Sequence, residues 1–150
     1  MREVSPPLVM SYLLLLLSFL VLASCSQPEI LADRLVERMG VTYEVDSDEP
    51  FTGSAVEFHK NGQLLSKINY KDGKRDGLFE TFFSENGQLK FRKNFRDGKK
   101  DGLAEIFHKN GRLKNRANFR DGKANGLFEE FREDGKLLWR GNYKAGVKID

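Results

Sequence analysis

"NGQLLSKINYKDGKRDG" occupies residues 61–77, and "NGQLKFRKNFRDGKKDG" occupies residues 86–102. The two stretches are versions of one phrase in which the glycines stay fixed while the residues between them vary. The glycine that closes each stretch belongs to a series that recurs every 24 or 25 residues, at Gly53, Gly77, Gly102 and Gly126. A fixed period of this length predicts a repeat architecture in which one supersecondary unit is used several times.

Each copy also contains a dipeptide that favours a tight turn. These dipeptides are Asn61-Gly62, Asn86-Gly87, Asn110-Gly111 and Asp134-Gly135. Such pairs accept positive φ at both positions of a two-residue type I′ turn, so each unit is predicted to be a β-hairpin. Pairing about Asn110-Gly111 places Glu105 opposite Arg116 and Gly102 opposite Phe119, and an aromatic residue is expected opposite the strand glycine of every unit. The extra residue of the second unit, between Gly77 and Gly87, is expected to form a bulge.

The second strand of each hairpin alternates between two kinds of residue. Leu64, Ser66, Ile68 and Tyr70 and their equivalents are expected on one, mainly apolar face, and Lys67, Arg92, Arg116 and Arg140 on the other. The links between hairpins, such as "FRDGKKDG", are too short and polar for helical crossovers, so neighbouring hairpins must pair with each other. We therefore predict an all-β fold, an elongated antiparallel meander of repeated β-hairpins in a single twisted sheet.

This lattice resembles the bacterial variant of the MORN repeat over residues 51 to about 148, through "NG(Q/R)L", "N(Y/F)(K/R)DGK" and the closing glycine. The resemblance implies a repeat domain at 35–150, with a half-repeat at 35–52 and repeats at about 53–76, 77–101, 102–125 and 126–150. It also implies binding rather than catalysis. The last unit departs from the pattern in "YKAGVKID", which we interpret as a terminal cap or a place where another strand could add.

A second signal lies ahead of the repeats, where an apolar block ends in "LASC" at residues 22–25 with the only cysteine of the chain. The apolar core is too short to span a bilayer. Its ending resembles the bacterial lipobox, in which the signal is cut before a cysteine that is then acylated. We therefore predict a signal peptide at 1–24, lipidation of Cys25 and a tether at 25–34; the alternative is an ordinary secretory signal with an incidental cysteine.

Acylation of Cys25 would hold the protein on a membrane of the bacterial cell envelope, because two or more acyl chains give stable anchoring. By resemblance to lipoproteins that are sorted on their second mature residue, Ser26 favours the outer membrane in a cell that has one.

The sequence contains few candidate residues for catalysis or metal binding. His59 and His108 share a repeat position, but no further ligands accompany them at metal spacing. The Asp-Gly links fit turn chemistry better than a calcium loop. The formal net charge of +3 is too small and too dispersed to indicate nucleic acid. We expect no cofactor, no metal, no nucleic-acid partner and no enzymatic activity.

The candidate binding surface combines aromatic and basic side chains on the polar face of the sheet: Phe58, Phe107, Phe131, Lys67, Arg92, Arg116 and Arg140. Glutamates opposite the basic residues are expected to compensate much of this charge. The leading hypothesis is a membrane-anchored, non-enzymatic module that binds an unidentified protein partner. Two alternatives stay open: an antitoxin or immunity-type inhibitor of a toxin, which rests on family naming, and a binder of anionic lipid headgroups. The oligomeric state is undetermined by sequence.

Overall fold

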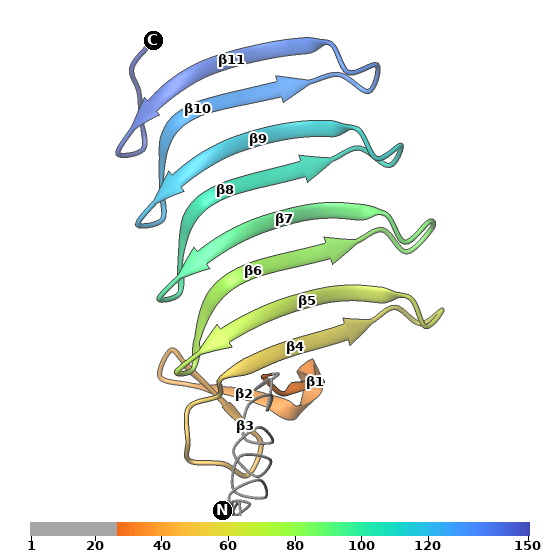
Figure 1. The fold of residues 1–150 in the computed structure, drawn as a ribbon, viewed down its shortest axis with the longest axis vertical. Helices are drawn as coiled ribbons and strands as arrows, with labels where there is room; N and C mark the ends of the chain where they lie inside the picture. The colour runs from red at the N-terminus through yellow and green to blue at the C-terminus, as the bar shows by residue number, and fades with distance from the viewer. Residues whose placement is uncertain (1–26) are drawn as a thin grey trace, which may run out of the picture.

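Successive hairpins lie side by side in one long, twisted β-sheet (Figure 1). The computed structural model describes residues 27–150. Ten strands form the sheet in the order β1-β4-β5-β6-β7-β8-β9-β10-β11-β12, and β2 and β3 form a separate two-stranded sheet. The strands are β1 (Glu29–Leu31), β2 (Leu35–Arg38), β3 (Val41–Glu44), β4 (Gly53–Phe58), β5 (Leu64–Lys71), β6 (Lys74–Phe82), β7 (Leu89–Arg96), β8 (Lys99–Phe107), β9 (Leu113–Arg120), β10 (Lys123–Phe131), β11 (Leu137–Lys144) and β12 (Val147–Lys148).

This arrangement confirms the predicted all-β meander. A short 3-10 turn, η1 (Ala32–Arg34), follows β1. Within residues 27–150 there is no helix long and apolar enough to cross a membrane. The Asn-Gly turns follow one another along one long side of the sheet and the Asp-Gly turns along the other (Figure 1).

The pairing of each strand glycine with an aromatic residue is confirmed. Its members are Gly53 with Tyr70, Gly77 with Phe95, Gly102 with Phe119 and Gly126 with Tyr143. The glycine is required for a further reason, because φ of Gly102 is +104° at a bulge between hairpins. A Cβ at Gly102 would lie 3.3 Å from Cβ of Asn94, whose Nδ2 donates to the carbonyl oxygen of Leu103 at 2.9 Å. The asparagine thus bonds the backbone of the bulge.

The two-residue turn with positive φ at both positions occurs at the Asp-Gly links and not, as the sequence suggests, at the Asn-Gly pairs. The amide of Gly62 donates to the carbonyl oxygen of His59 at 2.9 Å, and only the glycine of Asn61-Gly62 has positive φ. This is a three-residue loop closed by a glycine bulge, so the predicted type I′ turn is wrong at these positions. Both residues have positive φ instead at the Asp-Gly links, with φ of +48° at Asp97 and +79° at Gly98.

A bulge in the strand that follows the turn of each hairpin corrects the assignment of residues to faces. The third hairpin keeps the expected register from Gly102 to Ile106, but Phe107 then pairs with Leu113. Leu113 therefore lies on the face of the charged stripe, and so do its equivalents, Leu64, Leu89 and Leu137. The extra residue of the second unit lengthens its turn loop, which the bond from the amide of Gly87 to the carbonyl oxygen of Phe83 closes.

The segment ahead of the repeats covers the first edge of the sheet. Strand β1 lies within the predicted tether and pairs in parallel with β4. The β2–β3 hairpin docks on the first Asp-Gly turn, where the amide of Thr42 donates to the carbonyl oxygen of Gly73 at 2.8 Å. The amide of Gly73 in turn donates to the carbonyl oxygen of Phe51 at 2.9 Å. These bonds join the half-repeat to the first hairpin.

The last strand is covered over part of its length. Strand β12 pairs with the end of β11, and the side-chain amide of Asn142 donates to the carboxylate of Asp150 at 2.6 Å. Residues 137–141 of β11 have no partner strand on their outer side within the described part of the chain.

Few side chains are buried in this single layer. The buried hydrophobic residues are Phe51, Ala55, Val56 and Ala117. Neither face of the repeat sheet is covered by a second layer in residues 27–150 (Figure 1). Both faces of the sheet are therefore accessible to a partner.

Candidate functional site

The basic stripe that the sequence indicated is largely neutralised within the sheet. Lys67, Arg92 and Arg116 form ion pairs with Glu29, Glu105 and Glu129, respectively. Only 9% of Glu105 and 8% of Glu129 is exposed, so these carboxylates are buried beneath their arginines. Arg140 has no ion pair within the described residues. The predicted register that places Glu105 opposite Arg116 is correct, but the ion pair of Glu105 is with Arg92 on its other side.

The predicted phenylalanines lie on this same face, beside the Asn-Gly turns. The guanidinium of Arg92 lies 5.9 Å from the ring centroid of Phe107, and that of Arg116 lies 5.9 Å from that of Phe131. Phe107 and Phe131 are half-buried, whereas Phe58 is 50% exposed. A role of these rings in binding stays a prediction.

The predicted turn residues form a hydrogen-bonded ladder between hairpins. Asn61, Asn86 and Asn110 each donate through Nδ2 to a carbonyl oxygen in the turn of the next hairpin. Their Oδ1 atoms accept from the amide two residues ahead, and Asp134 keeps only this second bond. Within residues 27–150, no further turn of this kind lies beside Asp134 to accept a bond from a donor there.

The two histidines extend this ladder rather than a metal site. Nε2 of His59 lies 3.2 Å from the carbonyl oxygen of Phe82, and Nε2 of His108 lies 3.0 Å from that of Phe131. Within residues 27–150, His, Cys, Asp and Glu side chains do not gather into a group of three or more that could hold a metal ion.

The opposite face of the sheet carries clusters of aromatic rings, two of which flank the third hairpin, and we call it the aromatic face. Phe79 and Phe91 pack edge to face with ring centroids 5.1 Å apart in the second hairpin. Phe128 and Trp139 lie 5.4 Å apart in the fourth. In the third hairpin, Ala104 takes the position of Phe79 and Phe128, and Asn115 takes that of Phe91 and Trp139. Ala104 pairs with Ala117. Because these side chains are small, the surface is recessed between the two clusters of rings.

A hollow of about 160 Å³ lies over these alanines. Its lining includes Ile106, Phe119 and Phe128 and two half-buried lysines, Lys93 and Lys100. We call it the lysine hollow. Nζ of Lys93 lies 4.1 Å from the ring centroid of Phe91, and Nζ of Lys100 lies 5.1 Å from that of Phe119. Neither ammonium group makes an ion pair within the described part of the chain.

The surroundings of the hollow disfavour the charged form of Lys93. Burial lowers the pKa of Lys93, and the nearby charge of Lys100 lowers it further. Two cations thus lie close together on this surface, and neither forms an ion pair with an acid of residues 27–150. Such a pair offers a binding site for an anionic group.

Neither lysine is predicted as a site residue from the sequence, although one signal is present. Lys93 interrupts the otherwise apolar series Leu89, Phe91 and Phe95. Lys100 lies in a link that we interpreted only as turn chemistry. The alternation of β8 already places Lys100 on the face of Ala104, and the bulge shifts the register so that Lys100 pairs with Phe95. A meander without that bulge would place Lys100 opposite residue 97, two residues further from Lys93 along the strand.

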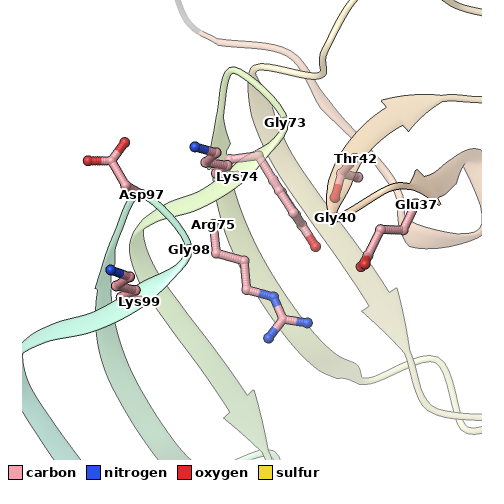
Figure 2. Close-up of a pocket in the computed structure, with 10 residues that line it drawn as sticks. Glu37, Gly40, Thr42, Gly73, Lys74, Arg75, Asp97, Gly98 and Lys99 are labelled. Atoms are coloured by element: carbon pink, nitrogen blue, oxygen red, sulfur yellow. The ribbon is translucent and has the colours of Figure 1, made fainter. Parts of the chain in front are cut away.

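A second hollow, of about 340 Å³, lies where the β2–β3 hairpin meets the Asp-Gly turns. Figure 2 shows Glu37 on the hairpin side and Lys74, Arg75 and Lys99 on the side of the turns. Asp97 adds a second acid to its lining. Because charges of both signs line this hollow, it does not select a ligand of one charge.

The geometry defines a class, the single-layer repeat proteins in which β-hairpins stack into an elongated sheet. Within that class, the model of the family described as "MORN repeat variant" matches residues 51–72, 76–97 and 100–121. Three consecutive hairpins of this chain therefore match the variant type of the MORN repeat. The fourth hairpin, beyond the matched residues, repeats their geometry.

Other comparisons add little. No curated protein matches the chain. Among solved structures, it is similar to a crystal structure of an S. aureus TarM mutant in complex with Fondaparinux, alpha-GlcNAc-glycerol and UDP. The identity is 9% and the TM-score is 0.38, over 98% of this chain and 24% of that chain. The present chain therefore spans about a quarter of the TarM chain, and this likeness carries no functional argument.

Proposed function

We propose that the protein is a non-enzymatic interaction module whose aromatic face binds a protein partner. The observation that carries the proposal is the uncovered aromatic face itself, with two clusters of rings and a hollow between them. Aromatic side chains are the usual energetic centres of protein interfaces, and concave apolar sites with a few polar groups are the usual binding sites.

The aromatic face is favoured over the charged stripe because the stripe compensates its own charge. Glu105 and Glu129 are buried against Arg92 and Arg116, so a ligand would have to break existing ion pairs there. The lysine hollow requires no such exchange.

The sequence "LASC" supports a location for this module. An acylated Cys25 would place the sheet at a membrane of the bacterial envelope, joined to it by the segment that precedes β1. Cys25 lies outside the residues that the structure describes, so this part of the proposal rests on the sequence alone.

Strand β8 offers a matched pair of variants to test the binding face. Ile106, on the aromatic face, is 39% exposed, and Leu103, on the charged face, is 37% exposed. Threonine keeps strand propensity at either position. Affinity capture from membranes of the native host, with purified wild-type protein as bait, should recover a partner that Ile106→Thr loses and Leu103→Thr retains. Loss of the partner with Leu103→Thr alone would place the interface on the charged face and overturn the proposal.

A further inference from the structure

We propose that the lysine hollow binds an acidic segment of the partner protein, with a carboxylate between Lys93 and Lys100 and a neighbouring apolar side chain over Ala104 and Ala117. The proposal rests on the function proposed above and names the chemistry of the partner.

The charge of the hollow is complementary to that of an acidic ligand. Lys93 and Lys100 converge on one hollow and have no acidic partner within residues 27–150. The acids on the aromatic face, Glu57 and Glu130, lie near the Asn-Gly turns, whereas Lys100 lies near an Asp-Gly turn. A carboxylate in the hollow would relieve the repulsion between the two ammonium groups, and charge-assisted hydrogen bonds to it would be stronger than neutral ones.

The shape of the hollow also selects its ligand. The floor of the hollow is made by alanine, and its apolar rim includes Ile106, Phe119 and Phe128. Ile106 is among the large hydrophobic residues that remain exposed. An apolar side chain next to the carboxylate would cover this surface, so the site matches an acidic residue with a leucine, isoleucine or phenylalanine as its neighbour.

The same geometry favours a peptide over a lipid headgroup. A flat anionic membrane attracts basic side chains that project into water. Lys93 and Lys100 are half-buried beside the rings of Phe91 and Phe119 instead. A segment that inserts a side chain between the two clusters of rings can reach both ammonium groups.

The test selects ligands from a phage-displayed library of random 12-residue peptides on the full chain, purified in neutral detergent. The selected peptides should contain an aspartate or glutamate beside an apolar residue. Exchange of that acid for its amide, or the double substitution Lys93→Gln and Lys100→Gln in the protein, should weaken binding about tenfold or more. The double variant Lys60→Gln and Lys144→Gln makes the same charge change at exposed sites on other hairpins and should leave binding unchanged.

Three outcomes would overturn the proposal and separate it from the function on which it rests. Peptides that lose affinity with Ile106→Thr but not with the Lys93 and Lys100 variant would leave the aromatic face as the interface and refute the acidic partner. Peptides that bind both variants with full affinity would refute the interface as well. Mixed micelles containing phosphatidylglycerol that bind more tightly than any peptide, through Lys93 and Lys100, would show that a membrane occupies the hollow.

Discussion

The side-chain amide of Asn110 donates a hydrogen bond of 3.0 Å to the carbonyl oxygen of Glu133, so the turn of the third hairpin is bonded directly to the turn of the fourth. Oδ1 of Asn110 accepts from the amide of Arg112 within its own turn. One side chain therefore shapes its own hairpin and fixes it to the next, which explains an asparagine in a turn that does not require positive φ at that position.

Replacement of Asn110 by aspartate keeps the acceptor of this pair and removes the donor. The variant should lower the free energy of unfolding by about 0.5–1.5 kcal/mol, because a hydrogen bond is lost and a carboxylate faces a carbonyl oxygen. Urea denaturation measures the change. Asp134→Asn is the matched control at the end of the ladder and should shift stability by no more than about 0.5 kcal/mol. Equal losses in both variants would mean that the bond between the turns contributes nothing.

The Asp-Gly turns provide a second comparison at equal backbone geometry. Gly73 and Gly98 have φ of +74° and +79°. A Cβ at Gly98 has no atom within 4 Å, whereas a Cβ at Gly73 would lie 2.3 Å from Cγ1 of Val41 and 2.8 Å from the carbonyl oxygen of Thr42. Gly98→Ala should therefore cost about 1–2 kcal/mol from left-handed backbone strain alone.

Gly73→Ala should cost clearly more, because it also displaces the β2–β3 hairpin from the first repeat. Thermal unfolding compares the two proteins, and limited proteolysis between residues 35 and 52 reports detachment of the hairpin. Equal melting temperatures and equal cleavage would show that the docking of this hairpin contributes no stability.

The meander was predictable because its determinants are local. Period, turn dipeptides and short links each act within one unit, and they agree with one another. The type of each turn was harder to predict from the sequence. Both Asn-Gly and Asp-Gly accept positive φ, and the sequence does not say which pair forms the two-residue turn. The bulge at Lys114 decides that choice by shifting the register of the hairpin.

The site was harder to predict than the fold because it arises between hairpins. Lys93 and Lys100 come from adjacent strands, and the register shift after Lys93 determines how close Lys100 lies to it along the sheet. The parallel strand β1 was equally inaccessible, because three residues without periodicity become a strand only when β4 offers its edge. The repeat period therefore predicts the pairing within each hairpin, but not the bulges and the edge strand that lie between or beside the hairpins.

The predicted lipid anchor can be tested at Cys25 independently of the repeat domain. Cys25→Ala should leave uncleaved precursor, and mass spectrometry of the wild-type mature protein should find an acylated cysteine at its N-terminus. Fractionation should then place the wild-type protein with membranes, with the outer membrane expected from Ser26 in a cell that has one. An unmodified N-terminus at or beyond Ser26 would contradict the prediction.

The last prediction concerns the cost of keeping a cation on the aromatic face. The folded state lowers the pKa of Lys93 below its ordinary value of 10.5, so the unfolded chain holds this proton more tightly than the folded chain. The resulting destabilisation is fully present below the folded-state pKa and vanishes as pH rises towards 10.5. Lys93→Met should therefore be more stable than the wild-type protein at neutral pH, by about 0.5–2 kcal/mol if it follows other surface-charge changes. Its advantage should shrink as the solution becomes alkaline, which urea denaturation across this pH range would measure.

Lys60→Met, at an exposed turn, should show no such trend. A less stable Lys93→Met protein would mean that the contact of the ammonium with Phe91 outweighs the burial of its charge, and the lysine would then be explained by stability rather than by binding.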